Sequence, residues 1–320
     1  MKTWGIAILI SIAVLAGGVA SHAQTQPDMR VTLLGTGNPL PSPERFGPST
    51  LVEAGPEKLL FDCGRGCTIR LMQKNIPLRA VKLFITHHHS DHTNGIPDLW
   101  LTGWLPAPWA KRESAFTVIG PEGTRNLMEH LEQAYMPDIR IRMADQKLPR
   151  EGISFNARDI TPGVVYEANG VKVTAFEVDH GDKIKPAYGY RVDYRGRSVV
   201  ISGDTRFNQN VIKYGTGADV LIHEVAMAKP EVLARSEAAR LILAHHTSPQ
   251  EAGRVFGIAK PRLAVYTHIS AAGGAGPDEP KPADYIAATR ETYTGPLEFG
   301  EDLMTINVGE TVTVERPEKR

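Results

Sequence analysis

Four candidate metal ligands, His87, His89, Asp91 and His92, crowd into one short segment of the chain, residues 87–92, which reads HHHSDH. The apolar stretch before it predicts a strand. Alternate side chains project to the same side where an extended chain leaves a strand, so His87 and His89 can share one metal ion. The turn that follows can bring Asp91 and His92 to a second ion. Because neutral imidazole and carboxylate are ligands that suit zinc, the segment predicts a zinc site.

The pattern His-x-His-x-Asp-His at a strand exit is a specific signal, whereas a lone histidine more often serves the core or the surface. It resembles the motif with which members of the metallo-β-lactamase superfamily hold two metal ions. The resemblance implies an α/β fold, the four-layer αββα sandwich in which two sheets pack between helices. His88 falls between the motif positions, and we expect it not to be a ligand.

The resemblance implies three further ligands, and candidates occur downstream in the family's order. His180, Asp204 and His268 each follow a predicted strand. In the family, the equivalent of Asp204 bridges the two metal ions. The resemblance therefore implies two zinc ions per chain, one held by His87, His89, His180 and Asp204 and the other by Asp91, His92, His268 and Asp204.

Within the superfamily, the chain resembles ribonuclease Z and its relatives over most of its length. That resemblance rests on segments 33–39 (LLGTGNP), 61–64 (FDCG), 189–191 (GYR) and 221–224 (LIHE).

Segment 244–252 (AHHTSPQEA) resembles an extra histidine motif of that family, in which a histidine and a glutamate form a proton-handling pair. Alignment through Glu251 selects His246 over His245, although a slip of one residue stays open. Glu224 is the expected partner of His246. For both members of the pair, the alternative is an ordinary structural role.

These residues together imply a hydrolytic mechanism. A hydroxide held between the two metals would attack the ester, and Asp91 would orient this nucleophile. His246, oriented by Glu224, would give its proton to the departing oxygen.

Departures from ribonuclease Z narrow the expected substrate. The chain has no long, basic, glycine-rich excursion like the arm that grips transfer RNA in that family, and its 36 basic residues are balanced by 36 acidic ones. We therefore expect no nucleic acid partner. Segments reading HTSP and VYTH resemble the exported zinc-dependent arylsulfatase group, so we expect hydrolysis of a small-molecule aryl sulfate ester. The alternative is a phosphodiesterase or phosphotriesterase, including a ribonuclease Z-like enzyme, and a non-catalytic metal-binding protein ranks below both.

The N-terminus predicts export. Lys2 is followed by an apolar stretch, residues 6–20, which is short for a membrane span of ~20 residues, and then by Ser-His-Ala before Gln24. We expect residues 1–23 to be a signal peptide and 24–320 to form a single hydrolase domain, periplasmic or secreted and free of the membrane after cleavage. An uncleaved N-terminal anchor is the alternative. The sequence leaves open whether the protein forms a homodimer.

Cys63 and Cys67 are the two cysteines of the chain. Export would permit a disulfide between them. We nevertheless expect two small buried thiols, one at a strand end and one at a helix start. A zinc site is not expected here, because no second cysteine pair exists to complete it.

Alternating strands and helices must position these residues, which suggests a layered α/β chain. Residues 100–112 hold three of the four tryptophans beside two prolines, and they predict either a rigid pocket wall or a satellite core. A helix should follow the histidine segment, and the other predicted helices are 68–74, 125–135 and 248–256. The predicted strands are 31–34, 50–53, 58–61, 81–86, 116–119, 171–178, 189–194, 199–202, 220–223 and 263–267.

Overall fold

The computed structural model describes Met1 and residues 27–273, 276 and 279–318. Apart from Met1, the predicted signal peptide lies outside these residues, and it stays a prediction. In the part of the chain that is described, no helix is both long and apolar enough to cross a membrane.

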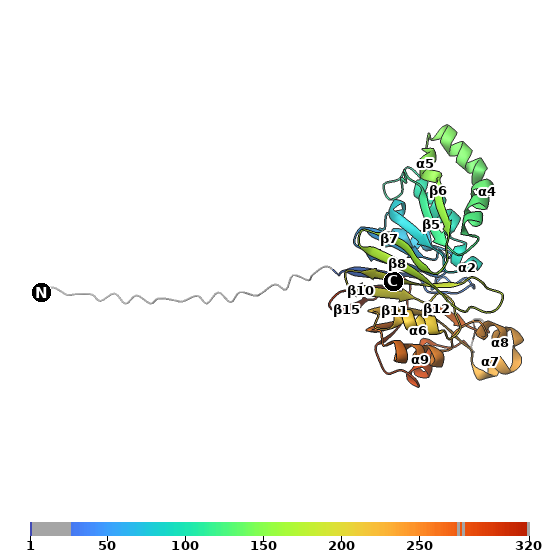
Figure 1. Ribbon diagram of the computed structural model, residues 1–320, viewed down its shortest axis with the longest axis vertical. Helices are drawn as coiled ribbons and strands as arrows, with labels where there is room; N and C mark the ends of the chain where they lie inside the picture. The colour runs from blue at the N-terminus through green and yellow to red at the C-terminus, as the bar shows by residue number, and fades with distance from the viewer. Residues whose placement is uncertain (2–26, 274–275, 277–278, 319–320) are drawn as a thin grey trace.

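Two β-sheets pack face to face with helices on their outer sides, which confirms the predicted α/β, four-layer αββα sandwich (Figure 1). In spatial order, the eight-stranded sheet contains β15 (Val312–Glu315), β14 (Thr305–Val308), β1 (Met29–Gly35), β2 (Ser49–Ala54), β3 (Glu57–Phe61), β4 (Val81–Phe84), β5 (Phe116–Gly120) and β6 (Phe155–Asp159). The seven-stranded sheet contains β13 (Leu297–Phe299), β12 (Leu263–Ala271), β11 (Val220–Met227), β10 (Arg197–Ile201), β9 (Tyr188–Tyr194), β8 (Val171–Glu177) and β7 (Gly163–Ala168).

The helices divide between the two outer layers. The N-terminal half supplies α1 (Cys67–Gln73), α2 (Ser90–Thr93), α3 (Ile96–Trp104), α4 (Thr124–Asp145), α5 (Arg150–Ile153) and a short 3-10 helix, η1 (Leu78–Ala80). The C-terminal half supplies α6 (Gln209–Gly215), α7 (Pro230–Arg235), α8 (Glu237–Leu243), α9 (Pro249–Ala259) and α10 (Pro282–Arg290). Helices α7 and α8 lie beside the second outer layer, to the right of it in Figure 1.

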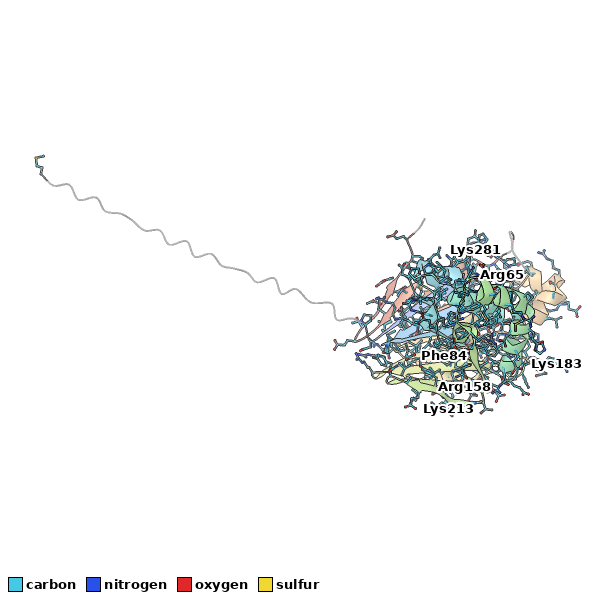
Figure 2. The ribbon with its side chains drawn as sticks, turned by 90° about the horizontal axis from the view of Figure 1, so that it is seen from above. Arg65, Phe84, Arg158, Lys183, Lys213 and Lys281 are labelled. Carbon is cyan, nitrogen blue, oxygen red and sulfur yellow. A yellow bond between two sulfur atoms is a disulfide. The ribbon has the colours of Figure 1, made fainter. Side chains whose placement is uncertain are left out.

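Apolar clusters fill the spaces between the layers. Between the sheets, the rings of Phe61, Phe84 and Tyr190 contact one another at centroid distances of 5.1 to 5.8 Å. Helices α1, α3 and α4 pack on the outer face of the eight-stranded sheet, and α6, α9 and α10 pack on that of the other. Burial of the apolar surface in these clusters, worth roughly 25 cal/mol per Å², stabilises all four layers. Charged side chains such as Lys183 and Lys213 lie instead at the edge of the molecule (Figure 2).

The predicted elements appear, but some continue further than expected. Strands β11 and β12 end at Met227 and Ala271 rather than at 223 and 267. Helix α4 runs to Asp145, ten residues past its predicted end, and contains Pro137. Strands β6 and β7 were not predicted, since both are largely exposed and lack a clear apolar alternation.

The tryptophan segment belongs to a core rather than to a pocket wall. Trp100 and Trp104 lie on α3 and are fully buried in the cluster outside the eight-stranded sheet. Their indole N–H groups donate to the carbonyls of Ile153 at 2.9 Å and Pro149 at 2.8 Å.

Candidate metal centre

Loops and bends at one edge of the two sheets carry the predicted ligands. Strand β4 leads into the histidine segment and α2, and β8 and β10 end just before two further candidates. Strands β10, β11 and β12 are parallel, so their carboxyl ends meet at the same edge. The structure therefore brings together all seven predicted ligands: His87, His89, Asp91, His92, His180, Asp204 and His268.

His87, His89 and His180 form the first group. Nδ1 of His89 lies 3.0 Å from Nε2 of His87 and 3.2 Å from Nε2 of His180. His89 is exposed at the mouth of the site, whereas the other two rings are buried. Three imidazole nitrogens at this spacing are a donor set that zinc takes.

Asp91, His92 and His268 form the second group, and all three are buried. Oδ2 of Asp91 lies 3.2 Å from Nε2 of His268 and 3.5 Å from Nε2 of His92. The grouping is the one that the family resemblance implies.

Asp204 lies between the two groups. Its Oδ2 is 3.9 Å from Nε2 of His87 and 3.7 Å from Nε2 of His180. The same oxygen is 3.3 Å from Nε2 of His92 and 3.2 Å from Nε2 of His268. One carboxylate thus faces two histidines of each group, which is the position that a bridging ligand needs.

Hydrogen bonds behind the first group turn unprotonated nitrogens inward. Oγ1 of Thr86 donates to Oδ2 of Asp62 at 2.9 Å, so in its 3.0 Å contact with Nδ1 of His87 the ring is the donor. Nδ1 of His180 donates to the carbonyl of His245 at 2.9 Å. Both rings therefore direct an Nε2 lone pair into the group. Convergent lone pairs need a positive charge between them, and so these residues fit a metal ion.

Burial also favours the neutral imidazoles that metal binding requires. It lowers the pKa of His180 to about 4 and that of His87 well below the usual 6.5. Burial would lower the pKa of His92 too, but Asp204 and Asp62 outweigh it and raise that pKa well above 6.5. Burial would raise the pKa of Asp204, yet His268 and His92 hold it well below its usual range. The carboxylates around the second group thus favour positive charge there, which is the charge that a metal cation would supply.

Asp62 supports the candidate site, and we did not single it out from the sequence. Oδ2 of its side chain accepts from Nδ1 of His92 at 2.8 Å, and Oδ1 accepts from the backbone N–H of Thr86 at 2.8 Å. Nε2 of His92 is then left facing the site, buried and without a hydrogen-bond partner among the described residues. The sequence alone did not indicate this role, because it arises from the parallel pairing of β4 with β3, the strand that Asp62 directly follows.

Glu224 and His246 form the predicted pair beside the second group. Glu224 is fully buried, and its Oε1 accepts the backbone N–H groups of Thr205 at 3.2 Å and Thr247 at 3.0 Å. Its Oε2 lies 3.2 Å from Nδ1 of His246. Burial would lower the pKa of His246, but the Glu224 carboxylate outweighs it and raises that pKa to about 9. The Glu224 carboxylate therefore favours the protonated form of the ring.

The contacts of His245, His246 and His88 distinguish the roles of these histidines. His245 contributes its carbonyl to His180, whereas the ring of His246 stacks on that of His268 with centroids 5.4 Å apart, so the one-residue slip is resolved. His88 is exposed and donates from Nε2 to the carbonyl of Glu122 at 3.1 Å, outside both groups.

We predicted that His268 follows its strand, but it lies within β12. The register of β11 against β12 shifts at this point, because Glu224 pairs with Thr267 and Val225 pairs with Ile269. His268 is the extra residue of this bulge, with φ of 42°. A bulge re-aims one side chain, and here it turns an imidazole toward Asp91 and Asp204.

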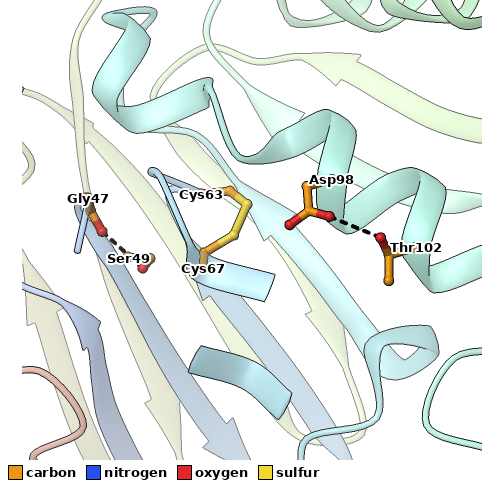
Figure 3. Close-up of a disulfide and its surroundings, with 6 residues drawn as sticks. All are labelled: Gly47, Ser49, Cys63, Cys67, Asp98 and Thr102. Carbon is orange, nitrogen blue, oxygen red and sulfur yellow. Dashed lines mark hydrogen bonds between the residues drawn. A yellow bond between two sulfur atoms is a disulfide. The ribbon is translucent and has the colours of Figure 1, made fainter. Parts of the chain in front are cut away.

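Cys63 and Cys67 are joined by a disulfide, contrary to the two thiols that we expected (Figure 3). Their Cα atoms are 5.6 Å apart, which is an ordinary span for such a bond. Gly66 at φ of 83° and the first turn of α1 bring the two residues together. Spacing alone could not show that turn.

Comparisons with known proteins agree with this geometry. A family model described as Anti-Pycsar protein Apyc1 matches residues 29–241. Ribonuclease Z of Mycobacterium avium (strain 104) is 35% identical over 283 residues, which cover 88% of this chain and 98% of that protein.

Solved structures resemble the fold over nearly the same length. They include YhfI of Bacillus subtilis, a metallo-β-lactamase fold protein (TM-score 0.67, 19% identity, 87% of this chain and 98% of the other). Human tRNase Z, short form, has a TM-score of 0.65 at 23% identity and covers 87% of this chain and 99% of its own. Zn(2+)-bound PqqB of Methylobacterium extorquens has a TM-score of 0.60 at 12% identity and covers 87% of this chain and 100% of its own.

These matches bear on two expectations about the substrate. They give the aryl sulfate ester no support, and the ribonuclease Z relative fits the alternative, a ribonuclease Z-like phosphodiester hydrolase, better. They also run against the expectation of no nucleic acid partner, since ribonucleases act on RNA. The chain is a metal-dependent hydrolase. It belongs to the family whose model is described as Anti-Pycsar protein Apyc1, within the ribonuclease Z-like branch of the metallo-β-lactamase superfamily.

Proposed function

We propose that this protein hydrolyses phosphodiester bonds with two zinc ions held at the edge of its sheets. The observation that carries the proposal is the position of Asp204, whose Oδ2 faces two histidines of each ligand group. Zinc is favoured by the donor set, five histidines and two aspartates, and is the metal that PqqB holds in the same fold.

When bound, two such cations lower the pKa of a water between them and neutralise charge on the ester oxygens. His87, His89 and His180 would hold one cation, and Asp91, His92 and His268 the other. Asp91 would also accept a hydrogen bond from the attacking water and so orient it.

His246 would donate the proton that the departing oxygen needs. Its Nδ1 is fixed toward Oε2 of Glu224, which leaves Nε2 as the donor on the other side of the ring. Glu224 itself is held by the backbone of Thr205, the residue after the bridging Asp204. Proton donation by such a positioned side chain contributes typically ~10² to 10⁴ in rate.

The choice of phosphodiester over sulfate ester comes from the relatives, because the geometry alone serves both. A site that clamps a tetrahedral oxyanion does not distinguish sulfur from phosphorus. The 35% identity to ribonuclease Z over almost the whole of that protein supports phosphorus, and it makes RNA a substrate to be tested.

A panel of three esters with a common leaving group, together with an RNA, tests the proposal. Zinc-loaded protein is assayed on bis(4-nitrophenyl) phosphate, 4-nitrophenyl sulfate, a 4-nitrophenyl phosphotriester and a short single-stranded RNA. We expect the largest kcat/KM for a phosphodiester. Asp204→Asn should abolish turnover, while His88→Asn, which changes an exposed non-ligand of the same segment, should retain it. A larger kcat/KM for the sulfate would restore the aryl sulfate reading.

A further inference from the structure

The disulfide lies directly behind the second ligand group. Cys63 follows Asp62, the residue that holds His92, and Cys67 begins α1. Both cysteines are fully buried between α1, α3 and the eight-stranded sheet (Figure 3). The bond therefore closes the short segment 63–67 at its base.

The backbone of this segment is hydrogen-bonded to the segment that carries the ligands. The N–H of Cys63 donates to the carbonyl of His92 at 2.9 Å, and the N–H of Gly95 donates to the carbonyl of Cys63 at 2.9 Å. Gly64 packs so closely on Asp91 that a Cβ there would collide with the carbonyl oxygen of Asp91. Asp91 and His92, two ligands of the second group, thus rest on residues 63 and 64.

Asp62, directly before this segment, adopts an unfavourable backbone conformation. Its φ of 61° lies in the left-handed region, which costs free energy for a residue other than glycine. In that conformation both carboxylate oxygens are used, one on His92 and the other on the N–H of Thr86. A loop that is covalently closed one residue later restricts the alternatives that Asp62 could adopt.

We propose that the Cys63–Cys67 disulfide is a clamp that sets the metal affinity of the second group, Asp91, His92 and His268. It acts through Asp62 and the backbone of Cys63, which are positioning residues rather than ligands. The first group is anchored mainly elsewhere, since His180 is held by the carbonyl of His245 and His87 reaches Asp62 only through Thr86. The effect of the clamp therefore falls mainly on one of the two metal positions.

Opening the clamp needs a thiol reductant. A small dithiol supplies two electrons and two protons, the S–S bond becomes two thiols, and the dithiol becomes a cyclic disulfide. Because both sulfurs are buried, this exchange has to occur before or during folding. Protein folded in a reducing compartment would then bind its second metal ion less tightly than protein folded under oxidising conditions.

The clamp proposal depends on the two metal positions of the proposed function. Zinc titration tests the clamp and the proposed function separately. Stepwise zinc affinities are measured by competition with a chromophoric chelator for oxidised wild type, for wild type folded with dithiothreitol and for Cys63→Ala/Cys67→Ala. Cobalt(II) spectra then identify the weakened position, because the two groups differ in donor set. Loss of a supporting contact behind a ligand typically costs about 10- to 100-fold in affinity, and we expect this at the second position in the last two samples.

Leu71→Ala is the matched control, because Leu71 is buried in the same cluster on α1 and none of its hydrogen bonds among the described residues reaches a ligand. It should lower the midpoint of thermal unfolding and leave both affinities unchanged. Equal affinities in oxidised and double-variant protein, equal weakening of both positions, or two free thiols in the oxidised sample would overturn the clamp. Failure of oxidised wild type to bind two ions would instead overturn the proposed function.

Discussion

Replacing His246 by alanine should slow hydrolysis most where the leaving group is most basic. A departing phenolate with strongly electron-withdrawing substituents needs no proton, whereas an alkoxide does. The ring of His246 is held 3.2 Å from Glu224, and its side chain is only 11% exposed, so bulk water is poorly placed to replace it. We therefore expect the loss of most of a general acid's contribution, on the order of 10² or more in rate for a basic leaving group. That loss corresponds to about 2.7 kcal/mol of transition-state stabilisation.

The fold and the metal centre should survive the change. Oε1 of Glu224 keeps the backbone N–H donors of Thr205 and Thr247, so the buried carboxylate is not left without partners. Glu224→Gln is the conservative companion, because it keeps the size of the side chain and removes its charge. It should show the same dependence on the leaving group more weakly.

The assay is kcat/KM across a series of aryl and alkyl phosphodiesters for wild type, His246→Ala and Glu224→Gln at matched zinc content. The slope of log(kcat/KM) against the pKa of the leaving group should become steeper in both variants. Parallel lines, with the same loss for every ester, would mean that His246 binds substrate or supports the fold, and the proton-donor role would be wrong.

Three other predictions test different levels of the structure. Asp204→Ala should remove both metal ions, because its Oδ2 faces both ligand groups, and elemental analysis that still finds two tightly bound ions would refute the bridging role. The N-terminus of the protein from its producing cell should be Gln24, and mass spectrometry that recovers the full chain would refute the signal peptide. Glu57→Gln should lower the free energy of unfolding by about 1.5 to 3 kcal/mol at pH 7, since its carboxylate bonds Lys82 and, across the sheets, Tyr166. Burial would raise the pKa of Glu57, but these bonds outweigh it and lower that pKa. The stabilisation is therefore full above the pKa of Glu57 in the unfolded chain, and it shrinks as the pH falls through the pKa in the folded chain. Denaturant unfolding at pH 7 and pH 4 measures the difference in free energy of unfolding between wild type and Glu57→Gln, and the same difference at both pH values would refute the prediction.

The metal-binding segment could be read from the sequence because its information is local. His87 and His89 share a phase at the exit of a strand, and Asp91 and His92 follow within one turn, so no distant contact is needed to place them together. The sandwich itself followed from alternating apolar strands and helices and from the resemblance to a known superfamily.

The remaining ligands depend on contacts between residues far apart in the sequence. His268 meets Asp91 across 177 residues, and only the closure of two sheets at one edge makes that contact. Its orientation comes from a bulge at positive φ, which the apolar pattern did not indicate: the predicted strand stops at residue 267, whereas β12 continues to Ala271.

The contacts of the supporting residues depend on tertiary structure. Alignment through Glu251 favours His246 over His245, but only the way in which the segment after α8 enters α9 shows that the ring of His246 faces Glu224. Asp62 and the two cysteines read as an ordinary strand end, and their roles arise because β3 and β4 are parallel neighbours that end side by side. The sequence by itself determined which chemistry this chain can carry out, through the types and local spacing of its ligands. Only the folded chain decided which atoms converge, because the distances between residues on different strands are set by sheet order and packing.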